Sequence, residues 1–318
     1  MHGWLAGQES HLTILPDAAL CSLPVHQRTL RLGRREWPPG SFGIMAVINR
    51  TPDSFYDQGA TYELDAAIEA ADRAVRAGAE ILDVGGVKAG PGDEVTVAEE
   101  IRRVVPVVAA LRERHPGAVL SVDTWRAAVG AAVAAAGADL LNDAWGGADP
   151  DLARVAAEHD LGLVCAHAGG LAPRQRPHRS AHPALTGAVI SSLTAEAERA
   201  LAMGVSPDRI VIDPAHDFGK NTWHSLELTR RTADLAATGW PVLVAVSNKD
   251  FVGEALGLGL TERGEGTLAV LAVCAWEGAR LFRVHDVPAA RDALAAVAEM
   301  QTQHAHLARG GPGARAPG

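Results

Sequence analysis

The sequence predicts one α/β domain of the (β/α)8 barrel type, with eight parallel strands inside a ring of helices. From Ser41 onward, short β-branched or aliphatic runs alternate with longer, alanine-rich amphipathic segments, a pattern typical of βα units. Eight such short runs can be counted, and each carries a polar residue at or just after its end. The chain has 318 residues, 47% of them hydrophobic, which is enough for one such core because these barrels run to about 250 residues.

The expected strands are short and apolar. They cover Ile44–Ile48, Glu80–Val84, Val119–Val122, Asp139–Leu141, Leu163–Ala166, Ile210–Ile212, Val242–Val246 and Leu281–Val284. After the first of them an apolar face recurs at helical spacing, and Gly78 then ends the run as a C-cap residue would. That face consists of Leu64, Ala67, Ile68, Ala71 and Val75.

A short two-stranded element is expected ahead of the barrel, over Arg28–Trp37 with its turn at Gly33, where it would close the barrel floor. The expected organisation is therefore a tail and hairpin over residues 1–40, a barrel over residues 41–302, and a disordered tail over residues 303–318. The last residues are Gly, Ala, Pro and Arg, which have little to bury.

Composition excludes several classes of partner. A net charge of −9 works against recognition of a nucleic-acid backbone, which requires a clustered positive face. We find neither a signal peptide nor an apolar run of the ~20 residues that cross a bilayer. Cys21, Cys165 and Cys274 are far apart without a CxxC pair, which favours a reducing compartment. We expect a soluble, cytoplasmic enzyme without nucleic-acid or membrane partners.

Polar residues gather at the C-terminal ends of the expected strands, where barrels of this kind carry their chemistry. They are Asn49, Asp83, Asp123, Asn142, Asp143, His167, Asp213, Ser247, Lys249, Arg283 and His285. Each Asp, Asn or Ser alone could be a helix N-cap or a turn residue. Lys249, Arg283 and His285 are not cap formers, and they follow the seventh and eighth strands, where barrels commonly bind anions. The set therefore indicates a phosphorylated substrate.

The segment Asn49-Arg50-Thr51-Pro52-Asp53-Ser54-Phe55-Tyr56-Asp57 resembles the Asn-Val-Thr-Pro-Asp-Ser-Phe-Ser-Asp segment that follows the first strand of dihydropteroate synthases. The resemblance covers Arg28 to about Ala298. Further motifs resemble the family's in order: Asp83-Val84-Gly85-Gly86, Ser121-Val122-Asp123-Thr124, Asn142-Asp143, Asp213-Pro214, Phe218-Gly219-Lys220, Val246-Ser247-Asn248-Lys249 and Arg283-Val284-His285.

The resemblance implies condensation of 4-aminobenzoate with 6-hydroxymethyl-7,8-dihydropterin diphosphate, with release of diphosphate. The pterin's 2-amino and N3 edge offers two parallel N–H donors, which a carboxylate accepts bidentately, and Asp213 matches that role. Asp123 and Asn142 would satisfy the remaining ring nitrogens, and Lys249 would donate to the carbonyl or N5 side. Such a set rejects other rings, because a mismatched ligand leaves buried polar groups unpaired.

The resemblance also implies roles in diphosphate release, which Mg²⁺ and cationic side chains promote by stabilising negative charge. Asn49 fits as an oxygen ligand of Mg²⁺, and Arg283 and His285 would hold the diphosphate. Asp57 could stabilise a cationic pterin-methyl centre, so the expected catalytic residues are Asp57, Lys249, Arg283 and His285. A homodimer is implied as well, packed through Gly264–Gly278 and Val287–Glu299.

The chain departs from the family where the second substrate is expected. The family's Gly-Gly-Glu-Ser-Thr-Arg-Pro-Gly becomes Gly85–Gly92, with Ala89 and Gly90 in place of Thr and Arg, and Lys88 replaces the cation only as a flexible point charge. The family's Ser-Arg-Lys-Ser ends here in Asp250, which would repel an aminobenzoate carboxylate. A glycine-containing stretch becomes Ala215-His216-Asp217. We therefore expect weak or absent turnover of 4-aminobenzoate.

Three other hypotheses follow from the sequence. A non-catalytic pterin-binding or regulatory protein is favoured by Gly90 and Asp250, whereas the expected diphosphate residues argue against it. A methyltetrahydrofolate-dependent methyltransferase on the same kind of barrel would need no diphosphate cluster. A zinc site of His216, Asp217 and His224 has no usual ligand spacing. We read His167 as pocket wall or a satisfied core group and Cys165 as an inert core thiol.

Overall fold

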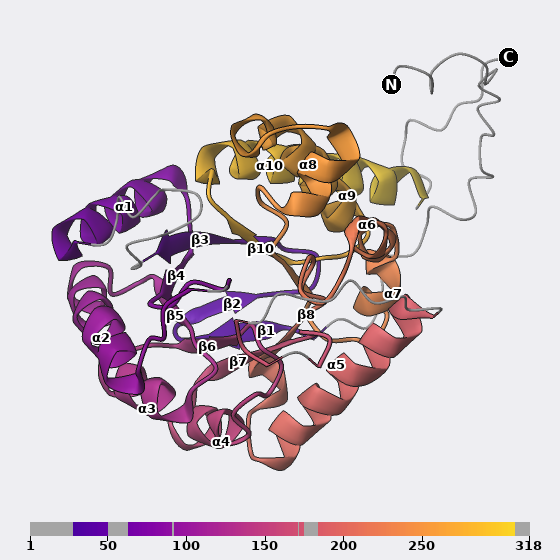
Figure 1. The fold of residues 1–318 in the computed structure, drawn as a ribbon. Helices are drawn as coiled ribbons and strands as arrows, with labels where there is room; N and C mark the ends of the chain where they lie inside the picture. Colours follow the sequence, from indigo (N-terminus) through magenta and orange to yellow (C-terminus); the bar gives the residue numbers. More distant parts are fainter. Residues whose placement is uncertain (1–27, 50–62, 91, 171, 175–183, 309–318) are drawn as a thin grey trace, which may run out of the picture.

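The computed structural model describes residues 28–49, 63–90, 92–170, 172–174 and 184–308. In this part of the chain, eight parallel strands form a barrel and helices surround it, as Figure 1 shows from one end. The strands pair in the order β8-β7-β6-β5-β4-β3-β10-β9, and a bridge between Ile212 and Val242 joins the two ends of the sheet. The (β/α)8 barrel expected from the sequence is therefore confirmed.

The barrel strands are β3 (Gly43–Asn49), β4 (Ile81–Gly85), β5 (Val119–Asp123), β6 (Leu140–Asp143), β7 (Gly162–Ala166), β8 (Ile210–Asp213), β9 (Leu243–Val244) and β10 (Leu281–Val284). The helices are α1 (Leu64–Ala77), α2 (Val97–Arg114), α3 (Ala127–Ala135), α4 (Asp151–Glu158), α5 (Leu185–Ala202), α6 (Thr222–Arg230), α7 (Thr232–Ala236), α8 (Asp250–Leu256), α9 (Gly264–Trp276) and α10 (Val287–Ala308). Short 3-10 turns at Pro207–Arg209 and Leu260–Glu262 complete the set.

Every expected strand matches the observed one within two residues at each end, and the seventh is the one that falls clearly short. The run Val242–Val246 was expected to be extended throughout, but only Leu243–Val244 pairs as a strand, and Val242 forms a single bridge. Ala245 and Val246, which follow this strand, are not part of the sheet, although Val246 is buried. Gly78 ends α1 as expected, with φ +108 and its N–H bonded to the carbonyls of Ala74 and Val75.

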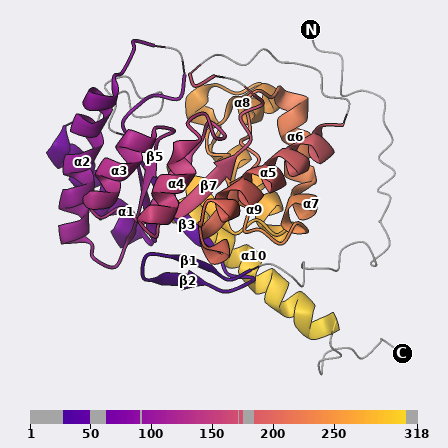
Figure 2. The same ribbon diagram turned by 90° about the horizontal axis from the view of Figure 1, so that it is seen from below.

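The hairpin of β1 (Leu30–Leu32) and β2 (Arg35–Trp37), which turns at Gly33 with φ +53, lies under the barrel in Figure 2. Its Leu30, Leu32 and Trp37 are buried in one cluster with a single residue from each barrel strand. These eight residues are Met45, Ile81, Val119, Leu140, Val164, Val211, Leu243 and Leu281, close to where the strands begin. The hairpin therefore closes the end of the barrel opposite the C-terminal ends of the strands, as predicted.

A buried arginine fastens this hairpin to the barrel. Arg280, only 1% exposed, donates from Nη1 to the carbonyl of Arg28 at 2.6 Å and from Nη2 to that of Pro38 at 2.7 Å. Burial lowers the pKa of Arg280 to about 10, which still leaves it protonated at neutral pH. Its charge is therefore met by backbone carbonyls at the floor.

The last helix corrects one expected boundary. The sequence predicted that the barrel ends at residue 302, with a tail over residues 303–318, but α10 continues as helix to Ala308 and extends beyond the barrel in Figure 2. The glycine- and proline-rich stretch after Ala308 lies outside the described residues. Among the helices of the described ranges, none combines the length and apolarity needed to cross a membrane.

Candidate functional site

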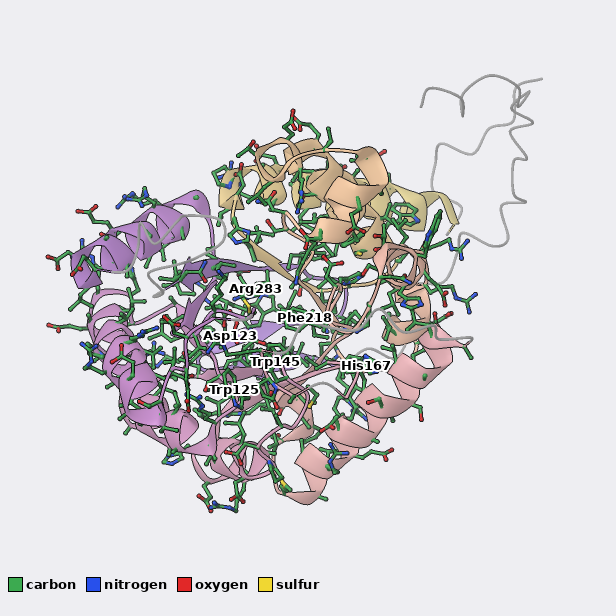
Figure 3. All side chains as sticks on the ribbon, viewed as in Figure 1. Asp123, Trp125, Trp145, His167, Phe218 and Arg283 are labelled. Carbon is green, nitrogen blue, oxygen red and sulfur yellow. The ribbon has the colours of Figure 1, made fainter. Side chains whose placement is uncertain are left out.

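A pocket of about 320 Å³ lies at the C-terminal ends of the barrel strands. It is lined by eight polar residues that the sequence singled out at the strand ends: Asn49, Asp123, Asn142, Asp213, Ser247, Lys249, Arg283 and His285. Figure 3 shows Asp123, Phe218 and Arg283 near the axis of the barrel. Pockets of about 300 Å³ or more commonly hold small organic ligands. The strand ends thus bring residues 236 positions apart in the chain, from Asn49 to His285, into one cavity.

Three of the polar residues predicted to share this rim are not among those that line the pocket. A further predicted catalytic residue, Asp57, lies outside the described residues. Asp83 is fully buried in the middle of β4, inside the barrel. Asp143 faces away, because neighbouring strand residues alternate, and it accepts from the N–H groups of Trp145 and Gly147 as a turn residue does. His167 lines a separate hollow beside Trp145.

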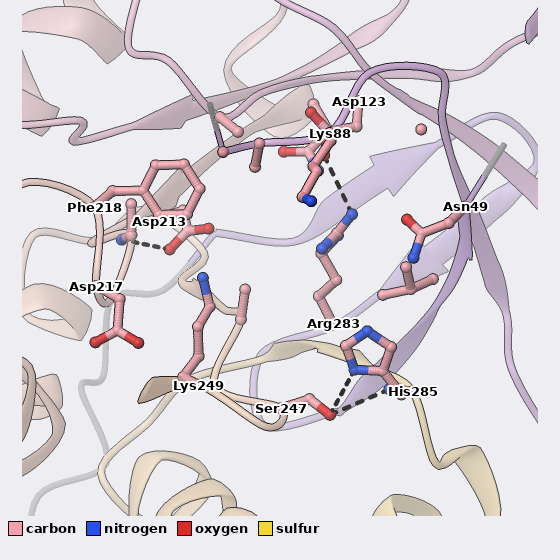
Figure 4. A pocket seen from close by; sticks show the side chains of 18 of the residues that line it. Asn49, Lys88, Asp123, Asp213, Asp217, Phe218, Ser247, Lys249, Arg283 and His285 are labelled. Carbon is pink, nitrogen blue, oxygen red and sulfur yellow. Dashed lines mark hydrogen bonds and ion pairs between the residues drawn. The ribbon is translucent and has the colours of Figure 1, made fainter. Parts of the chain in front are cut away.

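A charge network lies under the pocket. Arg283 donates from Nε to Asp83 Oδ2 at 2.6 Å and from Nη2 to Asp123 Oδ2 at 3.2 Å, which Figure 4 shows in part. The hydroxyl of Ser121 and the amide of Asn142 also donate to the Asp83 carboxylate, at 2.6 and 3.2 Å. One guanidinium therefore bridges two carboxylates, and Asn142 is held in place by the same network.

Asp123 is the member of this network whose protonation responds near neutral pH. Burial raises its pKa to about 7, although the Arg283 guanidinium favours its ionised form. The nearby Asp83 carboxylate acts in the same direction as burial, because two like charges repel. The pocket can therefore present Asp123 either as an acceptor or as a donor close to physiological pH.

Asp213 and Lys249 face each other across the pocket in Figure 4. The Oδ1 of Asp213 accepts from the Ala215 N–H at 2.7 Å, which fixes the carboxylate, and burial raises its pKa. Burial lowers the pKa of Lys249, whose Nζ stands 4.5 Å above the ring of Phe218. A fixed acceptor, an ammonium donor and an aromatic wall together suit a flat heterocycle with both donors and acceptors.

The loop after β8 takes an unusual backbone path beside this pair. Ala215 and Asp217 have φ values of +50 and +69, the left-handed region that favours glycine. Asp217 lines the pocket, and its Oδ2 accepts from the N–H of Phe251 at 3.3 Å near the start of α8. It thereby supplies a cap that α8 lacks from its own chain segment. Sequence reasoning missed this role, because residues 217 and 251 are far apart along the chain.

The remaining polar residues of this loop serve the fold. The ring of His216 is fully buried and stacks on Phe251, and His224 takes part in the capping box that begins α6. Lys220, predicted only as part of a motif, donates to the carbonyls of His167, Ala215 and Phe218. These contacts give His216 and His224 roles in the fold.

The part of the pocket assigned to a second substrate is formed by Lys88, Ala89, Gly90 and Asp250. Asp250 was expected to repel an anion, but its carboxylate is 69% exposed and forms an ion pair of 2.9 Å with Arg263. The expected repulsion is therefore reduced. The same arginine donates to the Asn248 carbonyl at 2.9 Å, a contact that no sequence pattern indicated.

Two of the expected diphosphate residues have different surroundings. His285 Nδ1 lies 3.0 Å from the Ser247 hydroxyl, and its backbone N–H donates to the same oxygen at 3.3 Å. Asn49 ends β3 and places its amide at the pocket. In the described part of the chain no three His, Cys, Asp or Glu residues form a metal cluster. An Asn49 oxygen alone fits Mg²⁺ that is held mainly by phosphate oxygens and water.

Comparison with known proteins gives consistent matches. Residues 45–285 match the family described as pterin binding enzyme. The chain is 59% identical over 262 residues to a Mycobacterium tuberculosis protein named inactive dihydropteroate synthase 2, covering 81% of this chain and 82% of that protein. It is 37% identical to the dihydropteroate synthase of Bacillus subtilis, covering 77% of this chain and 83% of the relative. The Yersinia pestis dihydropteroate synthase solved with a sulfonamide drug superimposes with a TM-score of 0.82 at 33% identity, covering 87% of this chain and 100% of that one.

Proposed function

Because this chain belongs to the dihydropteroate synthase family of pterin-binding enzymes, we propose that it binds 6-hydroxymethyl-7,8-dihydropterin diphosphate and transfers the pterin-methyl group to an amine. The observation that carries the proposal is the convergence of Asp123, Asn142, Asp213 and Lys249 on one pocket. We further propose that turnover of 4-aminobenzoate is weak or absent, since Ala89 and Gly90 line the acceptor side. The similar mycobacterial proteins are named inactive, which agrees with this direction.

Recognition of the pterin would use groups that are already fixed. Asp213, held by the Ala215 N–H, accepts from the 2-amino and N3 edge, and Asn142, held by Asp83, meets a ring nitrogen. Lys249 donates to the opposite side of the ring, which lies along Phe218. Preorganisation matters because groups that need not rearrange on binding lose little affinity to ordering.

The transfer step forms a carbon–nitrogen bond and breaks a carbon–oxygen bond. The amine nitrogen attacks the pterin-methyl carbon, the carbon–oxygen bond breaks, and its electron pair leaves on the diphosphate while the amine loses a proton. Arg283 and His285 would stabilise the departing charge electrostatically, and Asn49 would help to hold a Mg²⁺, which supplies further positive charge when it is bound. We also propose Asp57, beyond the described residues, as a stabiliser of developing positive charge on carbon.

Turnover with 4-aminobenzoate should be weak in the unmodified protein. Loss of a bidentate Arg contact to an anionic group costs about 2 to 5 kcal/mol in a buried site, or roughly thirty- to several-thousand-fold. Diphosphate release from the pterin diphosphate, measured with and without 4-aminobenzoate, checks this expectation. Turnover near the typical enzyme rate of about 10 s⁻¹ would show that Lys88 or a backbone contact replaces the Arg.

The double variant Gly90→Arg with Asp250→Ser should raise 4-aminobenzoate turnover at least about tenfold without tightening pterin binding. A Cβ at position 90 would have only Lys88 Cε within reach, at 4.0 Å, so the backbone there accepts a side chain without a clash at its first atom. The single change Asp250→Ser is the matched control and should give little by itself, because Asp250 is already paired with Arg263. A double variant that binds pterin normally but gains no turnover would contradict the assignment of this loop to the acceptor.

The second candidate is a protein that binds the pterin and does not turn it over, favoured by the names of the mycobacterial relatives. Calorimetric binding and kinetic measurements together distinguish the two candidate functions. Both require specific binding of the pterin diphosphate with Mg²⁺. Only the transferase releases diphosphate when an amine is supplied, with 4-aminobenzoate and other aryl amines as probes.

We propose that the protein is a homodimer that packs through α9 and α10, in line with the family resemblance. Val273 on α9 and Met300 on α10 are 45% and 52% exposed, which leaves apolar surface on both helices. Light scattering at micromolar concentration should give twice the mass of 33.2 kDa. A monomeric mass would refute the proposal. A cytoplasmic location, expected from the scattered cysteines, likewise remains our proposal.

A further inference from the structure

The loop between β4 and α2 forms one wall of the pocket, through Val87, Lys88, Ala89 and Gly90. Such a loop must satisfy its backbone carbonyls, and here four of them accept from arginines that lie elsewhere in the chain. These carbonyls belong to Gly86, Gly90, Asp93 and Val95. The loop is thus held at its start, its middle and its end.

The two ends of the loop are held by anchored side chains. Arg103 donates to the Gly86 carbonyl at 3.0 Å and pairs with Glu99 at 2.6 Å. Arg126 donates to the Val95 carbonyl at 2.7 Å and pairs with the buried Glu100 at 2.7 Å. Both arginines are therefore fixed by carboxylates of α2, which leaves the middle of the loop as the part that needs a separate support.

Arg174, from the segment after β7, provides that support. Its Nη1 donates to the Asp93 carbonyl at 2.6 Å and its Nε to the Gly90 carbonyl at 3.2 Å, across more than eighty residues of sequence. Arg174 itself has φ +65, a left-handed conformation that a non-glycine residue keeps only where its surroundings hold it. The guanidinium lies on the backbone of Gly90, the residue that replaces the family's arginine.

We propose that Arg174 is a positioning residue, which holds the β4–α2 loop so that Lys88 faces the diphosphate of the bound pterin. Figure 4 shows Lys88 pointing into the pocket close to Asp123 and above Arg283. The lysine side chain is flexible and does not by itself determine where its ammonium lies. The backbone of Lys88 must therefore be held in position if the ammonium is to contact a bound anion. The inference rests on the proposed function for the identity of the ligand, and on the hydrogen bonds of Arg174 for the support of the loop.

The test compares the affinities of two ligands that differ only in the diphosphate, both measured with Mg²⁺ present. They are 6-hydroxymethyl-7,8-dihydropterin diphosphate and the unphosphorylated alcohol. Arg174→Ala should weaken binding of the diphosphate by about tenfold, the size of one charge-assisted contact. The affinity for the alcohol should stay unchanged. Arg174→Lys should recover part of the loss, since one donor can still reach a carbonyl. Arg154→Ala is the matched control, because Arg154 makes exposed ion pairs with Asp151 and Glu158 on α4.

Hydrogen exchange of residues 86–95 gives a second readout that does not depend on any ligand. Their amides should exchange about tenfold faster in Arg174→Ala, while the amides of the barrel strands stay unchanged. Unchanged exchange and unchanged diphosphate affinity would overturn the inference, and so would an equal loss for both ligands, which marks a general structural role. Should the unmodified protein bind neither ligand, the proposed function fails, and the exchange comparison alone then decides whether Arg174 holds the loop.

Discussion

Replacing Asp213 by alanine should weaken binding of the pterin diphosphate by roughly thirty- to several-thousand-fold. Its carboxylate is buried and held by the Ala215 N–H, and it faces the pocket. Truncation leaves the two N–H donors of the pterin edge without acceptors in a desolvated site, which costs about 2 to 5 kcal/mol. Isothermal calorimetry with Mg²⁺ present measures the effect directly.

Asp250→Ala is the matched control for this experiment. Asp250 lines the same pocket, but it is 69% exposed and paired with Arg263, so its removal should change pterin affinity by less than about threefold. Circular dichroism of both variants should match that of the unmodified protein. An Asp213→Ala variant that is folded and binds the pterin with undiminished affinity would remove the basis of the functional assignment.

The second large effect concerns stability. Arg283→Met should destabilise the protein by about 3 to 5 kcal/mol at pH 8, because it leaves the carboxylates of Asp83 and Asp123 without their shared cation. Burial already raises the pKa of Asp123 to about 7, and the loss of Arg283 raises it further. The folded variant then binds protons that the unfolded chain, with ordinary carboxyl pKa values near 4, does not bind at the same pH. Stability of the variant therefore rises as the pH falls from 8 toward 5.

Urea unfolding of the variant and the unmodified protein at pH 8 and pH 5 measures this dependence. Arg280→Met serves as the control, since Arg280 is even more deeply buried but donates to backbone carbonyls. Its pKa of about 10 keeps it charged over this range, so its loss should cost the same at both pH values. An Arg283→Met variant whose cost is equal at pH 5 and pH 8 would show that the carboxylates do not determine it.

Apolar runs and alternation predict the barrel, since eight short strands and their order follow from where the chain must be buried. They do not predict backbone pairing, which is why Val242–Val246 contains only a two-residue strand. Alternation could have corrected two site residues. Asp83 stands two positions after the inward-facing Ile81 and so points into the barrel, whereas Asp143 follows the inward-facing Asn142 and so points outward.

The electrostatic partners of the site could not be predicted from the sequence. Arg283 meets Asp83 and Asp123 from 200 and 160 positions away, and only barrel closure brings them together. The pair of Asp250 with Arg263 joins residues 13 apart, across α8 and a short 3-10 turn, and no periodic pattern indicates it. Considered alone, Asp250 was expected to repel an anion, but its ion pair with Arg263 reduces that repulsion. The identity of a residue therefore predicts its charge but not the electrostatic potential around it.

The hairpin floor has a consequence for the order of events during catalysis. Leu30, Leu32 and Trp37 fill the lower end of the barrel, so a ligand reaches the strand ends only from the opposite side. A pterin between Asp213 and Lys249 then lies nearer the closed end than an amine that meets the β4–α2 loop. For the proposed reaction we therefore expect an ordered kinetic sequence, in which the pterin diphosphate enters before the amine and no new pterin enters until the joined product has left.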